Sequence, residues 1–337
     1  MKVCIYFEAE KLIQTSGIGR AQSHQKKALE LVGIPYTTDP SEDYDILHIN
    51  TLGMTSVPNI VKTHMEGKPV IYHAHSTEED FKNSFVLSNQ IAPFFKVHIV
   101  TLYSMADMLV TPTPYAKSLL ENYGITIPII PVSNGIEIAR YRRDEEKVRA
   151  FRTYFSLKPG QKVVMGVGFY FERKGIVDFI ETARQNPDLT FIWFGHTPAL
   201  YLKARVRQAI NDCPPNVILP GYVKGPIIEG AYSEADAFFF PSLEETEGIV
   251  VLEALASKCP VLVRDIGAFD PWLVHEVNCL KAVDVDGFSK QLRRIINKQI
   301  DTTEAGFKTA QERDLSEIGK QLKAVYEQVL AMPIGKE

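Results

Sequence analysis

Short apolar runs alternate with helical patterns along almost the whole chain. In the first half, the apolar runs cover residues 3–7, 46–49, 69–72, 108–110 and 127–132. Helical spacing of apolar residues falls between them, at residues 18–31, 91–105 and 115–123. Strands that alternate with helices form parallel sheets that are covered on both faces. The first half therefore predicts an α/β domain with a parallel sheet.

The same alternation restarts in the second half. Its apolar runs cover residues 162–167, 189–194, 217–219, 237–240 and 260–263, and its helical patterns cover residues 176–184, 200–210 and 249–257. The charged stretch 141–155 separates the two series. We therefore predict two Rossmann-like domains, residues 1–142 and 143–314, that face each other across a cleft. A last helical stripe follows them, with apolar residues at Ile318, Leu322, Val325, Val329 and Leu330.

Composition excludes several classes of protein. The chain has 337 residues, of which 45% are hydrophobic, enough for two cores. A net charge of −4 gives no indication of a nucleic-acid partner. The four cysteines are far apart and form no C-x-x-C pair, as is typical of a reduced cytoplasmic protein. We find no signal peptide and no apolar run near 18 residues, so any membrane contact is expected to be peripheral.

The most informative segment is PSLEETEGIVVLEALASKCPVL, residues 241–262. Glu245 and Glu253 stand eight residues apart, and Gly248 lies between them at the expected start of a helix. At ~1.5 Å per residue, the two carboxylates would lie roughly 10 Å apart along the helix. The helix N-terminus between them offers unpaired N–H groups to an anion. This layout matches a ligand with a polyol at each end and a diphosphate in the middle, such as a nucleotide-sugar. An amphipathic helix with a solvated carboxylate is the structural alternative.

The spacing P-S-x-x-E-x-x-G-x-x-x-x-E-A, which starts at Pro241, resembles the nucleotide-sugar motif of retaining glycosyltransferases of family four. That family has the GT-B fold. The resemblance implies an acceptor-binding first domain, a donor-binding second domain, and a C-terminal helix (residues 315–337) that crosses back to the first. It also implies that Glu245 binds the sugar hydroxyls, that Glu253 holds the ribose, and that Thr246, Glu247 and Gly248 contact the donor. Glu247 is a departure, because most relatives have an aromatic residue there.

A basic pair follows the first strand of the second domain. Arg173 and Lys174 precede Gly175, and two cations at the carboxyl end of a strand can neutralise a diphosphate. The alternative is a solvated turn with a surface ion pair. The segment resembles the family's basic pair, which stabilises the leaving group. Many relatives also carry an arginine directly after the preceding glycine, where this chain has Phe169.

Other candidate residues follow strands in both domains. Gly17 and Gly19 open a helix after the first strand, where glycine lets the backbone approach a phosphate; the alternative is a tight turn. His75 ends the run 69–72 and matches a family histidine near the transferred sugar better than His73 does; the alternative is a satisfied histidine at a strand end. Two loops of the second domain resemble those that hold the nucleotide base, and they contain Gly195, His196, Tyr222 and Val223.

The predicted reaction is retaining transfer of a hexose from a nucleoside-diphosphate sugar, UDP-glucose or UDP-galactose. The resemblance implies that the leaving diphosphate helps to deprotonate the acceptor, so that no protein nucleophile is required. We expect no metal ion and no other cofactor, because positive side chains and a helix N-terminus can stabilise the leaving group. The D-x-D strings at Asp43–Asp45 and Asp284–Asp286 are interpreted as structural, the second as a helix cap.

The opening of the chain (Glu8-Ala9-Glu10, then Ser16 to Ala21, then His24-Gln25) resembles a Gram-positive subgroup that glycosylates monoglucosyl-diacylglycerol for the lipoteichoic acid anchor. A glycolipid acceptor and a location at the inner face of the cell membrane are therefore expected. Residues 85–103 are rich in aromatic and apolar residues and could contact that membrane, with Lys82 and Lys96 beside them; the alternative is a buried core helix. Three other functions remain open: transfer to a soluble or polymer-linked glycan, a nucleotide-sugar epimerase, and a non-catalytic binding module.

Overall fold

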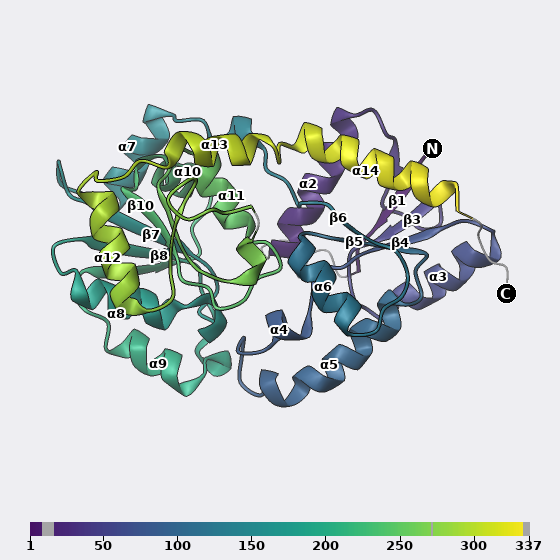
Figure 1. Cartoon of the computed structure of the whole chain (residues 1–337), viewed down its shortest axis with the longest axis horizontal. Helices are drawn as coiled ribbons and strands as arrows, with labels where there is room; N and C mark the ends of the chain where they lie inside the picture. Colours follow the sequence, from purple (N-terminus) through teal and green to yellow (C-terminus); the bar gives the residue numbers. More distant parts are fainter. Residues whose placement is uncertain (9–16, 271, 333–337) are drawn as a thin grey trace. The chain divides into compact units, whose positions relative to one another are not determined.

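The structure, a computed structural model, describes residues 1–8, 17–270 and 272–332, which form two compact units. The first unit contains Met1–Glu79, Ile91–Ile136 and Arg313–Glu337. The second unit contains Asp80–Gln90 and Glu137–Glu312. Each unit is built around its own six-stranded parallel sheet (Figure 1).

The sheet of the first unit has the order β2-β1-β3-β4-β5-β6. Its strands are β1 (Val3–Tyr6), β2 (Tyr36–Thr37), β3 (Ile46–Ile49), β4 (Val70–His73), β5 (Met108–Thr111) and β6 (Ile129–Pro131). Its helices are α2 (Gly17–Leu31), α3 (Ser56–Met65), α4 (Glu78–Phe81), α5 (Ser88–Tyr103), α6 (Pro114–Asn122) and α14 (Leu315–Leu330). Alternate strand residues point to opposite faces. One face packs against α2 and α14, and the other packs against α3, α5 and α6.

The sheet of the second unit has the order β12-β11-β10-β7-β8-β9. Its strands are β7 (Val163–Val167), β8 (Thr190–Phe194), β9 (Val217–Gly221), β10 (Ala237–Phe240), β11 (Val261–Arg264) and β12 (Leu280–Ala282). Its α-helices are α7 (Glu145–Tyr154), α8 (Ile176–Gln185), α9 (Ala204–Asn211), α10 (Pro226–Glu234), α11 (Ile249–Ala256), α12 (Val285–Ile296) and α13 (Thr303–Gln311). Short 3₁₀ turns are η1 (Ile138–Tyr141), η2 (Glu172–Lys174), η3 (Ala199–Tyr201) and η4 (Gly267–Phe269).

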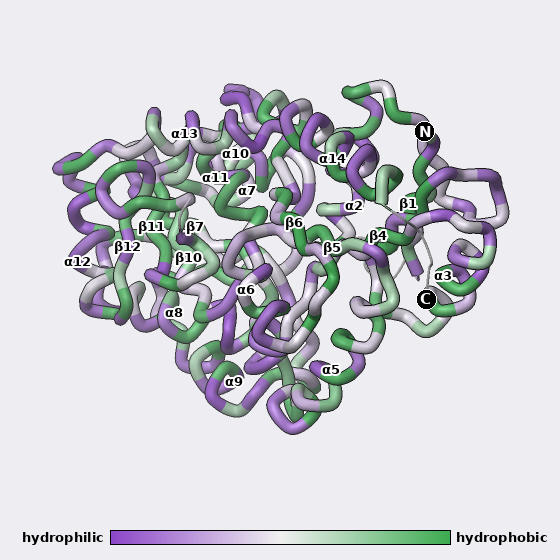
Figure 2. The backbone as a smooth tube through the Cα atoms, turned by 45° about the vertical axis from the view of Figure 1, so that its right-hand side comes forward, coloured by the Kyte–Doolittle hydropathy of each residue, from purple (hydrophilic) through white to green (hydrophobic). Residues whose placement is uncertain are grey.

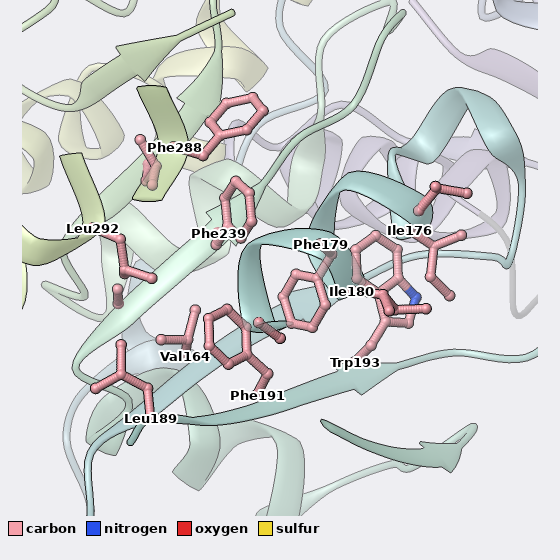
Figure 3. Packing of buried hydrophobic residues seen from close by; sticks show 14 of the residues in the cluster. Val164, Ile176, Phe179, Ile180, Leu189, Phe191, Trp193, Phe239, Phe288 and Leu292 are labelled. Atoms are coloured by element: carbon pink, nitrogen blue, oxygen red, sulfur yellow. The ribbon is translucent and has the colours of Figure 1, made fainter. Parts of the chain in front are cut away.

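Aromatic and aliphatic side chains fill one face of the second sheet (Figure 3). Phe179 from α8 packs against Phe191, Trp193 and Phe239 of the strands, with ring centroids 5.0–5.6 Å away. These strand residues are fully buried, and Figure 2 shows the strands as hydrophobic segments. Burial on both faces explains why the strands read as apolar runs.

The two Rossmann-like units predicted from the alternation are confirmed, and the structure adds detail at their edges. The short edge strands β2 and β12 were not predicted. The charged stretch 141–155, interpreted as an interruption, contains the helix α7, which Asp144 caps by accepting the N–H groups of Glu146 and Lys147. The last helix belongs to the first unit, where it packs against α2. Leu330 at its end is largely exposed, unlike the four other predicted apolar positions.

Residues 80–90 lie in the second unit, although the predicted boundaries place them in the first domain. The backbone N–H of Arg173 donates to the carbonyl of Asn83 at 3.0 Å, and the side chain of Lys203 donates to the amide oxygen of Asn83 at 2.7 Å. These polar contacts hold the segment against η2 and α9. The alternation of apolar residues cannot predict that residues 80–90 belong to the second unit, because side-chain and backbone hydrogen bonds determine this placement.

A stack of three histidines is buried between the first sheet and its helices. We call His48, His73 and His75 the histidine stack: the rings of His48 and His73 are 5.3 Å apart, and those of His73 and His75 are 4.1 Å apart. The hydroxyl of Tyr326 on α14 and the amide of Gln25 on α2 each lie 2.8 Å from Nδ1 of His48. Neither ring nitrogen of His73 has a hydrogen-bond partner among the described residues. The stack therefore runs from the covering helices to His75, just beyond the carboxyl end of β4.

We expect this stack to make the first unit sensitive to acid. Burial lowers the pKa of all three, and repulsion from neighbouring rings lowers that of His48 and His73 further; the pKa values of His48 and His75 fall to about 3. Between the unfolded pKa of about 6.5 and these depressed values, only the unfolded chain binds the protons, so stability falls as the pH falls. Three such groups together lower the free energy of unfolding by roughly 4 kcal/mol for each unit by which the pH falls.

The measurement is urea unfolding at pH values from 6.5 to 4.5. Each sample is then labelled with a pulse of deuterium at one fixed pH, and protection of the β3 and β4 amides reports whether the first unit is folded. His73→Phe keeps a flat ring in the stack and removes one titrating group, so the slope should fall by about 1.4 kcal/mol per pH unit. An unchanged slope in this variant would show that His73 does not titrate as described.

Candidate functional site

The strand order of the second sheet reverses between β7 and β10. The chain runs from β7 to β8 and β9 on one side, and then to β10, β11 and β12 on the other. In open parallel sheets, ligands bind at the carboxyl ends of the strands where such a reversal occurs. The loops at this position are residues 168–175 and 241–248, and these contain the basic pair and Glu245.

Lys174 and Glu245 meet across these two loops. Nζ of Lys174 forms a hydrogen-bonded ion pair with Oε1 of Glu245, which also accepts the Ser242 hydroxyl at 2.7 Å. Burial, and then repulsion from Arg173, lowers the pKa of Lys174. Gly175 allows the loops to approach, because a Cβ atom there would lie 2.2 Å from the carbonyl oxygen of Pro241. A buried lysine that already faces a carboxylate can bind a phosphate oxygen in the same way.

Arg173 has partners of its own in the second unit. Its guanidinium lies 2.8 Å from the carboxylate of Asp80, and its Nε donates to the Ser84 hydroxyl at 2.7 Å. Burial raises the pKa of Asp80, and the charges of Arg173 and Lys174 oppose that rise. Asp80 and Ser84 were not predicted from the sequence, because they are far from Arg173 in the chain and belong to no motif.

The helix α11 begins directly after Gly248, as predicted. Gly248 is the N-cap, with φ of +91° and no side-chain cap, a conformation that favours glycine. Glu253 is fully buried on this helix, where it accepts the Tyr232 hydroxyl at 2.6 Å. Glu247 is also buried, whereas Thr246 is half-buried. The two glutamates of the motif are thus placed on opposite sides of a helix N-terminus.

The loops after β8 and β9 lie at the same edge of the sheet. The N–H of Gly195 donates to the carbonyl of Gly221 at 2.8 Å, which joins the two loops. The side chains of His196 and Tyr222 are exposed, and Val223 is half-buried. Of the candidate residues on the second unit, Lys174 and Glu245 are in direct contact, and the others lie in α11 or in loops that follow strands.

The candidate residues of the first unit lie at the carboxyl ends of its own strands. Gly17 and Gly19 form the first turn of α2, and Nε2 of His75 lies 3.1 Å from the side-chain oxygen of Asn50, which follows β3. Sequence analysis missed Asn50, although its position directly after a buried strand could have indicated it. The neighbouring Ala9, Glu10 and Ser16 lie outside the described residues.

The D-x-D string at Asp284–Asp286 has the predicted structural role, since Asp284 caps α12 by accepting the N–H of Gly287 at 2.8 Å. In the other string, Asp43 pairs with Lys68 at 3.0 Å, and Asp45 accepts the backbone N–H of Lys2 at 2.7 Å.

The structure divides the segment 85–103 that was expected to contact a membrane. Phe85 belongs to the second unit, whereas most of α5 belongs to the first. On α5, Ile99 and Tyr103 are buried, so the core-helix alternative is correct for these two residues. Phe94 is 77% exposed. No helix in the part of the chain that the structure describes is long and apolar enough to span a bilayer.

Comparisons with known proteins identify glycosyltransferase relatives of both halves of the chain. The profile of "Glycosyltransferase Family 4" matches residues 39–140, and that of "Glycosyl transferases group 1" matches residues 161–298. The chain is 47% identical over 332 residues to a processive diacylglycerol alpha-glucosyltransferase of Acholeplasma laidlawii, covering 98% of this chain and 99% of the relative. It is 28% identical over 233 residues to an alpha-galactosylglucosyldiacylglycerol synthase of Streptococcus pneumoniae, covering 67% and 61%.

Solved structures support the fold. Anabaena HepE, in complex with UDP and glucose, has a TM-score of 0.78 at 18% identity and covers 97% of this chain and 100% of its own. Sucrose-phosphate synthase from Thermosynechococcus elongatus has a TM-score of 0.77 at 14% identity and covers 98% and 99%. Together with the two sheets and the relative at 47% identity, these matches show that the chain is a glycosyltransferase with the GT-B fold and belongs to glycosyltransferase family 4.

Proposed function

We propose that this glycosyltransferase moves a hexose from a nucleoside-diphosphate sugar to a glycolipid built on diacylglycerol. The observation that carries this choice is the 47% identity, over nearly the full length of both chains, to a processive diacylglycerol alpha-glucosyltransferase. UDP-glucose is the preferred donor and UDP-galactose the alternative. Diacylglycerol and its monoglucosylated form are the acceptors, which requires peripheral contact with a membrane.

In this proposal, the donor diphosphate lies at the carboxyl ends of β7 and β10, the central strands of the second sheet. Lys174 and Glu245 neutralise each other in the structure. A diphosphate replaces Glu245 as the partner of Lys174, which frees the carboxylate to accept hydrogen bonds from the sugar hydroxyls. The N–H groups at the start of α11 face the same edge and favour an anion. Arg173, which Asp80 holds in place, contributes positive charge nearby.

The rest of the donor follows from this orientation. Glu253 binds the ribose diol, which requires the Tyr232 hydroxyl to share the carboxylate. Thr246, Glu247 and Gly248 flank the diphosphate, and the buried Glu247 side chain is directed away from it. The loops with Gly195, His196, Tyr222 and Val223 hold the base. In the first unit, Gly17 and Gly19 approach the donor, and neutral His75, oriented by Asn50, hydrogen-bonds a sugar hydroxyl.

Transfer proceeds with retention at the anomeric carbon in this proposal. As the glycosidic bond to the diphosphate breaks, Lys174 and Arg173 stabilise the charge that develops on the leaving oxygen. That oxygen accepts the proton of the acceptor hydroxyl, which attacks from the same face of the sugar. The step requires neither a protein nucleophile nor a metal ion.

The first test is product analysis with purified protein in vesicles that contain diacylglycerol or monoglucosyl-diacylglycerol. We expect UDP-glucose to yield one or more added α-linked hexoses, detected by mass spectrometry and by NMR of the anomeric proton. Chelator should leave the rate unchanged. Transfer only to a soluble or polymer-linked glycan, or epimerisation of a nucleotide-sugar without transfer, would contradict the proposed acceptor or reaction.

The second test separates the two glutamates of the motif. Loss of a charged hydrogen bond of about 1.5–3 kcal/mol should weaken UDP binding by roughly 10- to 100-fold in Glu253→Ala, because UDP contains the ribose. Glu245→Ala should retain UDP affinity and lose transfer, because the sugar is no longer positioned at the reacting carbon. Calorimetric titration with UDP, together with initial rates, measures both effects.

Glu304→Ala, on the exposed face of α13, is the matched control and should behave as the wild type. Glu253→Gln guards against unfolding, since it keeps a hydrogen-bonding group at this buried position and should give an intermediate defect. If Glu245→Ala abolishes UDP binding while Glu253→Ala retains it, the proposed orientation of the donor is reversed.

A further inference from the structure

An apolar pocket opens on the second unit beside the basic pair. Its walls include the rings of Phe85, Phe169, Phe171 and Tyr201, together with Pro198, and its volume is about 270 Å³. We call it the aromatic pocket. Phe85 comes from residues 80–90, which belong to the second unit, and the others come from the loops after β7 and β8.

The aromatic pocket is poorly suited to a sugar. Pockets for small ligands usually have volumes of roughly 300–1,000 Å³, and a few precisely placed polar groups fix the orientation of the ligand. Two polar side chains, His196 and Thr197, also line this one, and the Thr197 hydroxyl already accepts the N–H of Tyr170 at 2.9 Å. A sugar would lose hydrogen bonds to water here without replacement. An unbranched hydrocarbon chain forms no hydrogen bonds to water, so it loses none when it enters the pocket.

Exposed apolar side chains lie close in sequence to the residues that line this pocket. Leu200 is 79% exposed and Leu87 is 58% exposed, and the N–H of Val86 donates to the carbonyl of Tyr201 at 3.3 Å, which joins the two segments. Leu87 has φ of +69°, a conformation uncommon for a residue other than glycine. Apolar side chains gathered on a surface in this way mark a site for an apolar ligand or a membrane.

Positive charge flanks the same surface. Lys203, Arg205 and Arg207 follow η3, and Glu172 forms ion pairs with the first two, at 3.0 and 3.5 Å. Three cations beside one carboxylate favour the anionic face of a lipid layer. An apolar pocket with a cationic flank therefore complements a lipid better than it complements a soluble glycan.

The aromatic pocket is also joined to the basic pair. The rings of Phe169 and Phe171 are 5.2 Å apart, and the guanidinium carbon of Arg173 lies 5.8 Å from the centre of the Phe171 ring. A lipid whose chain enters the pocket would therefore hold its polar end near the residues assigned to the leaving diphosphate.

We propose that the aromatic pocket binds one acyl chain of the lipid acceptor, an inference that rests on the proposed diacylglycerol-based acceptor. The pocket lies in the second unit, so both halves of the enzyme would recognise the acceptor. Burial of each methylene group contributes enough free energy for about a fourfold gain in affinity. Two more methylenes on the bound chain should thus raise affinity by roughly 15-fold.

The test is calorimetric titration with monoglucosyl-diacylglycerols that carry short saturated chains, used below their micelle concentrations. Lengthening one chain from six to eight carbons should lower the Kd of the wild type by about 15-fold. Phe169→Ser and Tyr201→Ser should each reduce this gain to less than about fourfold and leave UDP affinity unchanged. Tyr201 is half-exposed, so its variant should fold normally. Tyr154→Ser, at an exposed aromatic residue on α7, is the matched control and should keep the full gain.

Two results would overturn the inference. The first is an unchanged chain-length gain in both pocket variants, or loss of the gain in Phe94→Ser instead, which would assign the lipid to α5. The second is a tenfold loss of UDP affinity in Phe169→Ser, which would assign the pocket to the nucleotide. Because lipid binding is measured without turnover, failure of the enzyme to glucosylate these lipids would contradict the proposed function and leave the pocket result readable.

Discussion

The ion pair of Lys174 and Glu245 is the interaction on which the candidate site depends. A buried charge is stable only when it is paired and hydrogen-bonded, and this pair joins the two loops at which the strand order of the second sheet reverses. The Ser242 hydroxyl donates a further hydrogen bond to Glu245, and the carboxylate of Asp80 neutralises the charge of Arg173. Without a ligand, the cluster of these two cations and two carboxylates is neutral. A diphosphate can therefore enter by replacing a carboxylate that the protein already provides.

The pairing of charges also explains why residues 80–90 leave the first unit. Asp80 and Ser84 hold the guanidinium of Arg173, and Asn83 accepts a backbone N–H from the same residue. Phe85 then lies beside the aromatic residues that follow β7. One segment thus supports the basic pair and forms a wall of the aromatic pocket. In the proposed function, donor binding and lipid recognition therefore both depend on residues 80–90.

Apolar periodicity predicted most of the fold because the strands are buried on both faces. Runs such as 237–240 contain no polar residue, and the helices between them show clear stripes. The edge strands β2 and β12 were missed because two or three residues give no periodic pattern. The helix α7 was missed because half of its residues are charged, although Asp144 is a recognisable N-cap. The family of the chain was correctly inferred from the spacing of the two glutamates and the basic pair.

The contacts within the site were harder to predict. Lys174 and Glu245 are 71 residues apart, and only the order of the strands brings them together. The histidine stack similarly combines residues of β3 and β4 with Tyr326 from the far end of the chain. Sequence motifs identified His75 and Glu253 individually, but their partners Asn50 and Tyr232 belong to no motif. Parallel strand topology, rather than local sequence, determines these pairs.

The most direct test of the central claim is a crystal structure of the protein with UDP bound. We predict that an oxygen of the diphosphate lies within about 3 Å of Nζ of Lys174, and that Glu245 has separated from that lysine. The diphosphate should also face the N-terminus of α11. A diphosphate bound away from the loops after β7 and β10, with the Lys174–Glu245 pair intact, would contradict the account.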